Sequence, residues 1–323
     1  MPSKRSSRSV SVSAERSLDE LLEPRLAVEQ QFAKLGHTFR HGKLHRFLET
    51  HFTRPVLKTG LQLAGLYEAG KRNALRPELR SVTMEFLNLP AEYDGFQILH
   101  LSDFHIDGTD GLADVLAARL DELRPDLCVL TGDYRFEDHG PCGAVYPLMR
   151  KIVSSIRARH GIIGILGNHD AAEIACGLEE MGVRMLVNEA AEIGAGAVPI
   201  WLIGVDDNFD YGTDDLEKAV AGVPADGFKV LLAHAPELYE PAADNGIDLY
   251  LAGHTHAGQI RLPLVGAIKQ NARCPRAYAY GHWRYRGMQG YTSPGVGCSS
   301  LPIRFNCPPE LVLIELRCAL QEP

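Results

Sequence analysis

Hydrophobic residues follow one period in the first 80 residues of the chain and another in the rest. Between residues 18 and 70, apolar side chains recur at intervals of three and four, which predicts amphipathic helices; an example is the series Leu44, Phe47, Leu48 and Phe52. From residue 81 onward, short runs rich in Val, Ile and Leu alternate with helical patterns. The sequence therefore predicts a partly disordered, helical N-terminal extension, residues 1–80, and an α/β domain, residues 81–323.

The domain begins as alternating strands and helices and continues as a mostly β pattern. Strands are predicted at residues 81–89, 96–102, 126–133, 161–168, 183–189, 197–205, 228–234, 248–254, 258–264, 290–295 and 311–317. Helices are predicted at 111–126, 143–161 and 171–182. A βαβ first half followed by a β-rich second half predicts two stacked sheets with helices outside them. Residues 206–227 are expected to form an acidic surface loop.

Composition narrows the class of protein. Of the 323 residues, 45% are hydrophobic and 23% are charged, which is typical of globular domains. No apolar run reaches the length of about 18 residues that a membrane span needs. The basic, Ser-rich N-terminus also lacks the apolar stretch of a secretory signal, so we expect a cytoplasmic protein. The 7 cysteines never occur as CxxC, which favours reduced thiols over a disulfide framework or a zinc cluster.

Charge is divided unevenly along the chain. Residues 1–80 contain 15 Lys/Arg and 8 Asp/Glu, whereas the whole chain has a net charge of −8, so residues 81–323 carry −15. An acidic domain is a poor nucleic-acid binder. The basic extension has two interpretations, a helical segment packed on the domain or a peripheral membrane anchor. In the second, the residues facing lipid head groups would be Lys43, Arg46, Arg54, Lys58, Lys71 and Arg72.

Residues with metal-ligand chemistry follow the apolar strands one after another. They are Asp103, His105, Asp133, Asn168, His234, His254 and His256. A strand that stops at a carboxylate or imidazole places that group at a sheet edge, where binding sites form. Any one of these motifs is compatible with an ordinary turn, but packing alone does not explain the ordered set. The mixture of imidazole, carboxylate and amide donors without a thiolate favours Mn, Fe, Zn or Ni.

These motifs, DFH, GD, GNHD, a lone histidine and GHTH, resemble the signature of the calcineurin-like metallophosphoesterase superfamily. The resemblance extends from about residue 82 to 317. The C-terminal sequence also resembles bacterial phosphodiesterases similar to the Bacillus cell-wall-associated phosphoesterase and the chlamydial UDP-2,3-diacylglucosamine hydrolase. The superfamily implies a four-layer α-β-β-α sandwich of two mixed sheets. It also implies two divalent ions, one held by Asp103, His105 and His256, the other by Asn168, His234 and His254, with Asp133 between them.

The resemblance implies hydrolysis of a phosphodiester or phosphoanhydride by a hydroxide that bridges the two ions. His169 is expected to protonate the leaving oxygen and Asp170 to orient His169, although His169 is also compatible with a packed loop residue. Arg135 and Arg304 are candidate substrate contacts. The substrate is expected to be a small-molecule or lipid-linked phosphoester. Two alternatives stay open, a pyrophosphate hydrolase acting on UDP-2,3-diacylglucosamine and a non-catalytic scaffold on the same fold.

Overall fold

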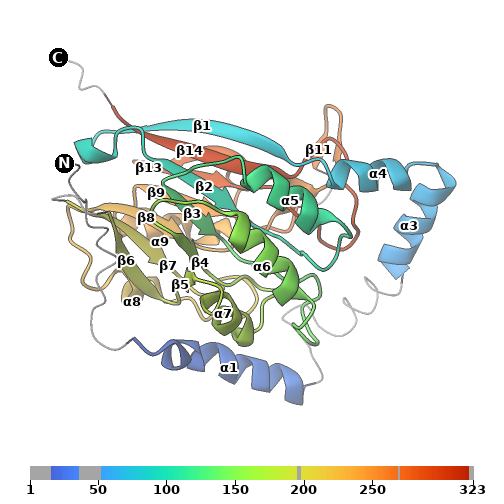
Figure 1. Cartoon of the computed structure of the whole chain (residues 1–323), viewed down its shortest axis with the longest axis horizontal. Helices are drawn as coiled ribbons and strands as arrows, with labels where there is room; N and C mark the ends of the chain where they lie inside the picture. Colours follow the sequence, from blue (N-terminus) through green and yellow to red (C-terminus); the bar gives the residue numbers. More distant parts are fainter. Residues whose placement is uncertain (1–15, 36–51, 195–197, 268–269, 320–323) are drawn as a thin grey trace, which may run out of the picture.

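The computed structural model describes residues 16–35, 52–194, 198–267 and 270–319. Two six-stranded sheets form its centre (Figure 1). The first sheet has the order β1 (Glu78–Phe86), β14 (Glu310–Cys318), β2 (Gln97–Leu101), β3 (Leu127–Leu130), β4 (Ile162–Gly164) and β5 (Val183–Met185). The second has the order β12 (Gly281–Tyr285), β13 (Met288–Thr292), β9 (Leu249–Ala252), β8 (Phe228–Leu232), β7 (Ile200–Gly204) and β6 (Glu189–Ile193).

Both sheets are mixed, and they pack face to face. In the first sheet only the β14–β2 pair is antiparallel, and in the second the antiparallel pairs are β12–β13 and β6–β7. Alternate side chains of each strand point to opposite faces. Ile98 and Val129 of the first sheet therefore share a core with Leu202 and Val230 of the second. Burial of these apolar faces against one another holds the two sheets together.

Helices cover the outer face of each sheet. On the first sheet, α5 (Leu112–Leu120), α6 (Val145–Ser155) and α7 (Ala172–Glu179) pack against residues that alternate with those of the inter-sheet core, such as Leu99 and Cys128. On the second, α8 (Leu216–Val220) and α9 (Tyr239–Asp244) pack against Ile203 and Leu231. The predicted four-layer α-β-β-α sandwich is therefore confirmed.

The N-terminal helices contact the sandwich at two places. Helix α1 (Leu18–Lys34) packs beside α7 and contributes Leu22 to the first core (Figure 1). Helices α3 (Arg54–Leu63) and α4 (Tyr67–Ala74) lie far from α1, against the segment that contains Leu301 and Ile303. The predicted lipid-facing residues Lys43 and Arg46 lie outside the described residues. Within the described part of the chain, no helix is both long enough and apolar enough to cross a bilayer.

The stretch 206–227 differs from the expected surface loop. It contains α8, and its first two residues, Asp206 and Asp207, are 2% and 0% exposed. The carboxylate of Asp207 accepts hydrogen bonds from the backbone amides of Phe209, Asp210 and Tyr211, which turn the chain back toward the sheets. This acidic segment is therefore folded and partly buried, because nearby backbone amides supply the hydrogen bonds that a buried carboxylate needs.

Candidate metal centre

The seven predicted ligands meet at one edge of the two sheets. They follow the carboxyl ends of β2, β3, β4, β8 and β9, and all seven are buried. Five of them have positive φ angles between 38° and 67°, namely Asp103, His105, Asp133, His254 and His256. Left-handed backbone is uncommon for residues other than glycine and clusters at functional sites, where the surrounding structure must hold it in place.

A first group consists of Asp103, His105 and His256. Their potential ligand atoms all lie within 4.8 Å of one another. Nε2 of His256 is 3.1 Å from Nε2 of His105 and 3.3 Å from Oδ1 of Asp103. Nδ1 of His105 donates to the carbonyl oxygen of Arg135 at 2.8 Å, so its Nε2 carries a lone pair. Burial lowers the pKa of the His105 imidazole to about 3, against the opposite effect of Asp133.

A second group consists of Asn168, His234 and His254. Oδ1 of Asn168 is 3.0 Å from Nε2 of His234 and 2.9 Å from Nδ1 of His254. Nδ1 of His234 donates to the carbonyl oxygen of Thr131 at 2.7 Å, which directs Nε2 toward the group. Three polar atoms from three strand ends therefore converge on one point.

Asp133 lies between the two groups. Its Oδ2 is 3.4 Å from Nε2 of His105 and 3.3 Å from Nε2 of His234. Its Oδ1 instead accepts a hydrogen bond of 2.8 Å from the backbone N–H of His169. One oxygen thus faces both groups, while the other binds the backbone of the loop that carries His169. Burial lowers the pKa of His234, but the adjacent Asp133 outweighs it and raises that pKa to about 10.

The donor set fits divalent cations. Lone pairs on imidazole nitrogens, carboxylate oxygens and an amide oxygen face one another, and this arrangement is repulsive without a positive charge between them. The ion pair of His234 with Asp133 supplies part of that charge. Imidazole with oxygen donors and no thiolate suits first-row transition metals.

Glycines allow the strand ends to approach this closely. Gly132, which precedes Asp133, has φ +89°, a conformation that L side chains rarely adopt. A Cβ at Gly167 would lie 2.3 Å from Oδ1 of Asp133, and one at Gly253 would lie 2.2 Å from Oδ2 of Asp103. A side chain at Gly167 or Gly253 would therefore displace a carboxylate of the candidate centre.

The His169 ring lies against the first group, its centroid 4.8 Å from that of His105, and Asp170 does not orient it as predicted. Nδ1 of His169 donates to the carbonyl oxygen of Phe136 at 2.6 Å, so this carbonyl orients the ring. The carboxylate of Asp170 accepts hydrogen bonds of 2.8 Å from the backbone amides of Asp133, Tyr134 and Gly167. Asp170 therefore joins the GD and GNHD loops through their backbones.

The two predicted substrate contacts are buried and bonded to backbone. Arg304 is 0% exposed and donates to the carbonyl oxygens of Pro294, Gly295, Gly297 and Cys307, so its guanidinium faces backbone rather than the predicted substrate. Arg135 is 3% exposed and donates to the carbonyl oxygens of His169 and Gly140. Both guanidinium groups thus stabilise the loops around the centre.

Two further side chains contact the second group and were not predicted. Oδ2 of Asp210 accepts a hydrogen bond of 2.9 Å from Nδ2 of Asn168, which turns the amide oxygen of Asn168 toward the histidines. The side-chain amide of Asn271 is 3.1 Å from Nε2 of His254. Neither residue is part of a strand-end motif, and the only available signal for Asp210 was the acidic composition of its loop.

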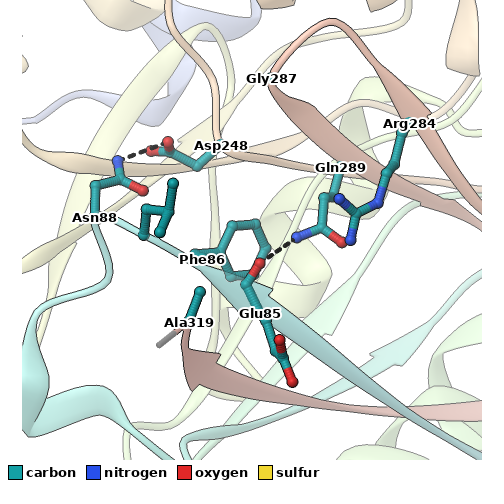
Figure 2. Close-up of a pocket in the computed structure, with 9 residues that line it drawn as sticks. Glu85, Phe86, Asn88, Asp248, Arg284, Gly287, Gln289 and Ala319 are labelled. Carbon is teal, nitrogen blue, oxygen red and sulfur yellow. Dashed lines mark hydrogen bonds between the residues drawn. The ribbon is translucent and has the colours of Figure 1, made fainter. Parts of the chain in front are cut away.

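A separate pocket of about 380 Å³ lies at the opposite ends of the strands (Figure 2). Its lining includes Phe86 at the end of β1 and Asp248 just before β9, whereas His254 follows the other end of β9. Nδ2 of Asn88 donates to Asp248 across it. This pocket is therefore distinct from the candidate metal centre.

Comparison with known proteins agrees with this geometry. Residues 96–258 match the family described as calcineurin-like phosphoesterase. The metallophosphoesterase YkuE of Bacillus subtilis (strain 168) is 30% identical over 242 residues, 71% of this chain and 82% of that protein. Phosphodiesterase YaeI of Escherichia coli (strain K12) is 31% identical over 231 residues, 68% of this chain and 82% of that protein.

A relative from Bos taurus, the transmembrane protein with metallophosphoesterase domain, is 30% identical over 288 residues. The alignment includes 82% of this chain and 62% of that protein's length. Matched residues 96–258 run from the start of β2 past His256 and include all seven predicted ligands, namely the six of the two groups and Asp133. The chain therefore belongs to the calcineurin-like phosphoesterase family and is a hydrolase of phosphoester bonds that uses divalent metal ions.

Proposed function

We propose that the chain is a phosphodiesterase with a binuclear metal centre that hydrolyses a phosphodiester or phosphoanhydride. The observation that supports this most directly is the position of Asp133, whose Oδ2 lies within 3.4 Å of a histidine from each ligand group. A carboxylate oxygen in that position suits a bridge between two cations. The relative YaeI is named a phosphodiesterase, which favours diesters over monoesters.

The first ion would be held by Asp103, His105 and His256, the second by Asn168, His234 and His254, and Asp133 would contact both. Two such ions would activate a water and neutralise charge on the phosphoryl group. The donor set favours Mn, Zn, Fe or Ni and leaves the choice among them open.

His169 would supply the proton for the leaving oxygen. Its Nδ1 is used by the carbonyl oxygen of Phe136, which leaves Nε2 for the substrate. Burial lowers the pKa of His169, but Asp133 and Asp138 outweigh this and raise it above the ordinary value. A histidine with a raised pKa that is partly exposed beside the centre suits general acid catalysis.

Two substitutions test this proposal with bis-p-nitrophenyl phosphate as substrate. Asp133→Asn should abolish turnover and leave the circular dichroism spectrum unchanged, because the amide bridges cations poorly. His169→Ala should lower kcat by about 100- to 10,000-fold for an alkyl diester, whose leaving oxygen needs a proton, and by much less for bis-p-nitrophenyl phosphate, whose phenolate leaves without one; the metal content should be preserved. The matched control is His282→Ala, which removes an exposed histidine of β12 and should retain activity. Full activity of the Asp133 variant would disprove the two-metal assignment.

We further propose that a lipid surface carries the substrate. Large apolar side chains are exposed on α3, where Val56 is 68% and Leu63 86% exposed, and on the β10 (Arg261–Leu262) to β11 (Gly266–Ala267) hairpin, where Leu264 is fully exposed. The two elements are neighbours, since Leu61 and Ile260 pack in one cluster. Residues 52–76 contain five Lys or Arg and only one Glu, which favours anionic lipid.

The α3 surface also lies near the candidate centre. The guanidinium of Arg54, at the start of α3, is 5.8 Å from the ring centroid of Phe136, whose carbonyl binds His169. Co-sedimentation with anionic vesicles should therefore fall for Leu63→Ser but not for Leu87→Ser, a substitution of a leucine that is 74% exposed beside the far pocket. Equal binding of the two variants would contradict this docking surface.

An alternative activity of the same centre is hydrolysis of the pyrophosphate in a nucleotide-linked lipid such as UDP-2,3-diacylglucosamine. Product analysis separates the two, because this activity must release UMP and a lipid phosphate. Hydrolysis of simple diesters without any turnover of the nucleotide-linked lipid would reject the alternative and retain the phosphodiesterase.

A further inference from the structure

Arg25 on helix α1 is a buried charge close to the candidate metal centre. It lies in the N-terminal extension, outside the residues matched to the family, and yet its side chain is 0% exposed. A charged side chain at that depth needs bonding partners that compensate for the loss of water. Nη1 of Arg25 contacts the carboxylate of Asp206, 181 residues further along the chain, which supplies the opposite charge.

The other terminal nitrogen of Arg25 binds the GNHD loop. Nη2 donates to the carbonyl oxygens of Gly167 and Asp170, the latter at 2.7 Å. The two residues between these carbonyls are Asn168, a ligand of the second group, and His169, the proposed acid. A single guanidinium group therefore fixes both ends of the dipeptide that carries these two side chains.

Other contacts of α1 stabilise the same loop. The guanidinium of Arg25 stacks 3.8 Å from the ring centroid of Tyr211, whose hydroxyl donates to the carbonyl oxygen of Asp170 at 3.1 Å. One turn further along α1, Oε1 of Glu29 accepts a hydrogen bond of 2.7 Å from the backbone amide of Ala172. The residues from 167 to 172 are thus bonded to α1 at three backbone positions.

We propose that Arg25 is a positioning residue that holds Asn168 at the second cation position, so that α1 is a working part of the metal centre. The proposal rests on the two-metal function above. Partners that orient metal ligands typically change metal affinity or activity by about 10- to 100-fold when they are removed. Because Arg25 contacts the loop of Asn168 and no ligand of the first group, its loss should weaken the second ion selectively.

Arg25→Lys is the primary test variant. Lysine keeps a positive charge for Asp206, but its single nitrogen cannot bind Asp206 and both loop carbonyls at once. Arg16→Lys is the matched control, since Arg16 anchors the same N-terminal segment to Glu179 and Glu189, away from the centre. Tyr211→Phe is a second, milder variant that removes only the hydroxyl bonded to Asp170.

The full-length proteins are stripped of metal and titrated with Mn²⁺ by calorimetry and electron paramagnetic resonance. Wild type and Arg16→Lys should bind two ions and give an exchange-coupled signal. Arg25→Lys should bind the first ion normally and the second about 10- to 100-fold more weakly, with a mononuclear signal at intermediate Mn²⁺. Tyr211→Phe should show a smaller change in the same direction.

Binding of two ions with wild-type affinity by Arg25→Lys would overturn the inference. An equal loss of affinity for both ions in Arg25→Lys, or unfolding of both Arg25→Lys and Tyr211→Phe, would also overturn it, because each result would mean a general role in stability. A single ion in the wild-type protein would instead refute the binuclear function on which the inference rests. The two failures are therefore distinguishable.

Discussion

Replacing Asp170 with asparagine tests how the structure holds its two ligand loops together. Oδ2 of Asp170 accepts hydrogen bonds from the backbone amides of Asp133 and Gly167, and Oδ1 accepts one from the amide of Tyr134, all at 2.8 Å. Oδ1 also accepts a longer bond of 3.4 Å from the amide of Arg135. The asparagine amide has only one acceptor oxygen. Its best orientation retains the bonds to Asp133 and Gly167 and turns an NH₂ group toward the N–H of Tyr134.

The expected loss in the free energy of unfolding follows from the three short hydrogen bonds. Hydrogen bonds to a charged group contribute ~1.5–3 kcal/mol each and those between neutral groups about 1, so both retained bonds weaken. The amide of Tyr134 is left buried without an acceptor, which costs a further ~1–3 kcal/mol. We therefore expect a loss of about 2 to 6 kcal/mol, a large share of the ~5–15 kcal/mol that stabilises a typical domain.

Urea unfolding of the metal-free proteins, followed by circular dichroism, measures this loss. The matched control is Asp248→Asn beside the pocket in Figure 2, where the partly exposed carboxylate accepts from Lys229 and Asn88. The free energy of unfolding of Asp248→Asn should fall by no more than about 1 kcal/mol, because water can replace the hydrogen-bond partners of this carboxylate. A decrease of less than about 1 kcal/mol in the free energy of unfolding of Asp170→Asn, with an unchanged slope against urea concentration, would refute the bridging role of Asp170.

Three further predictions concern the metal groups. Gly167→Ala should lower kcat by about 100-fold, measured with bis-p-nitrophenyl phosphate, because its Cβ would lie 2.3 Å from Oδ1 of Asp133. The raised pKa of His234, about 10, means that metal must displace its proton at neutral pH. Calorimetry should therefore show proton release on binding and an affinity that falls as the pH falls. Asp210→Ala should weaken binding of the second ion by about 10-fold, because Asn168 loses the acceptor that orients its amide.

Much of the fold was predictable because its central strands are buried on both faces. Such strands are continuous apolar runs, and the runs of β2, β3, β8 and β9 predicted the elements that precede the ligands. The strands β6 and β12, which form the two edges of the second sheet, were not predicted. Their sequences, EAAEI and GHWRY, contain polar residues at exposed positions and give no apolar run.

Convergence of the seven candidate ligand residues was predictable because each follows a strand, whereas the residues that support them were not predictable. Asp210 belongs to an irregular loop, and Arg25 meets Asp206 across 181 residues. Nothing in the local sequence around Arg25 distinguishes it from a solvated helix arginine. The role of Asp170 was inferred from the family pattern, whereas its carboxylate binds the backbone amides of Asp133 and Gly167.

The division of the chain at residue 80 stays a prediction. Strand β1 begins at Glu78 and pairs with β14 along its whole length, so the chain joins the first sheet close to that boundary. Helix α1 in turn supplies Leu22 to the core and Arg25 to the loop of the second ligand group. Short truncations of the extension should therefore affect the centre only when they include α1.

An anomalous-scattering map from a crystal soaked in Mn²⁺ tests the central claim most directly. The account predicts two peaks about 3.5–4 Å apart, on either side of Oδ2 of Asp133. One peak should contact His105 and His256, and the other His234 and His254. A single peak, or manganese bound away from Asp133, would contradict the account.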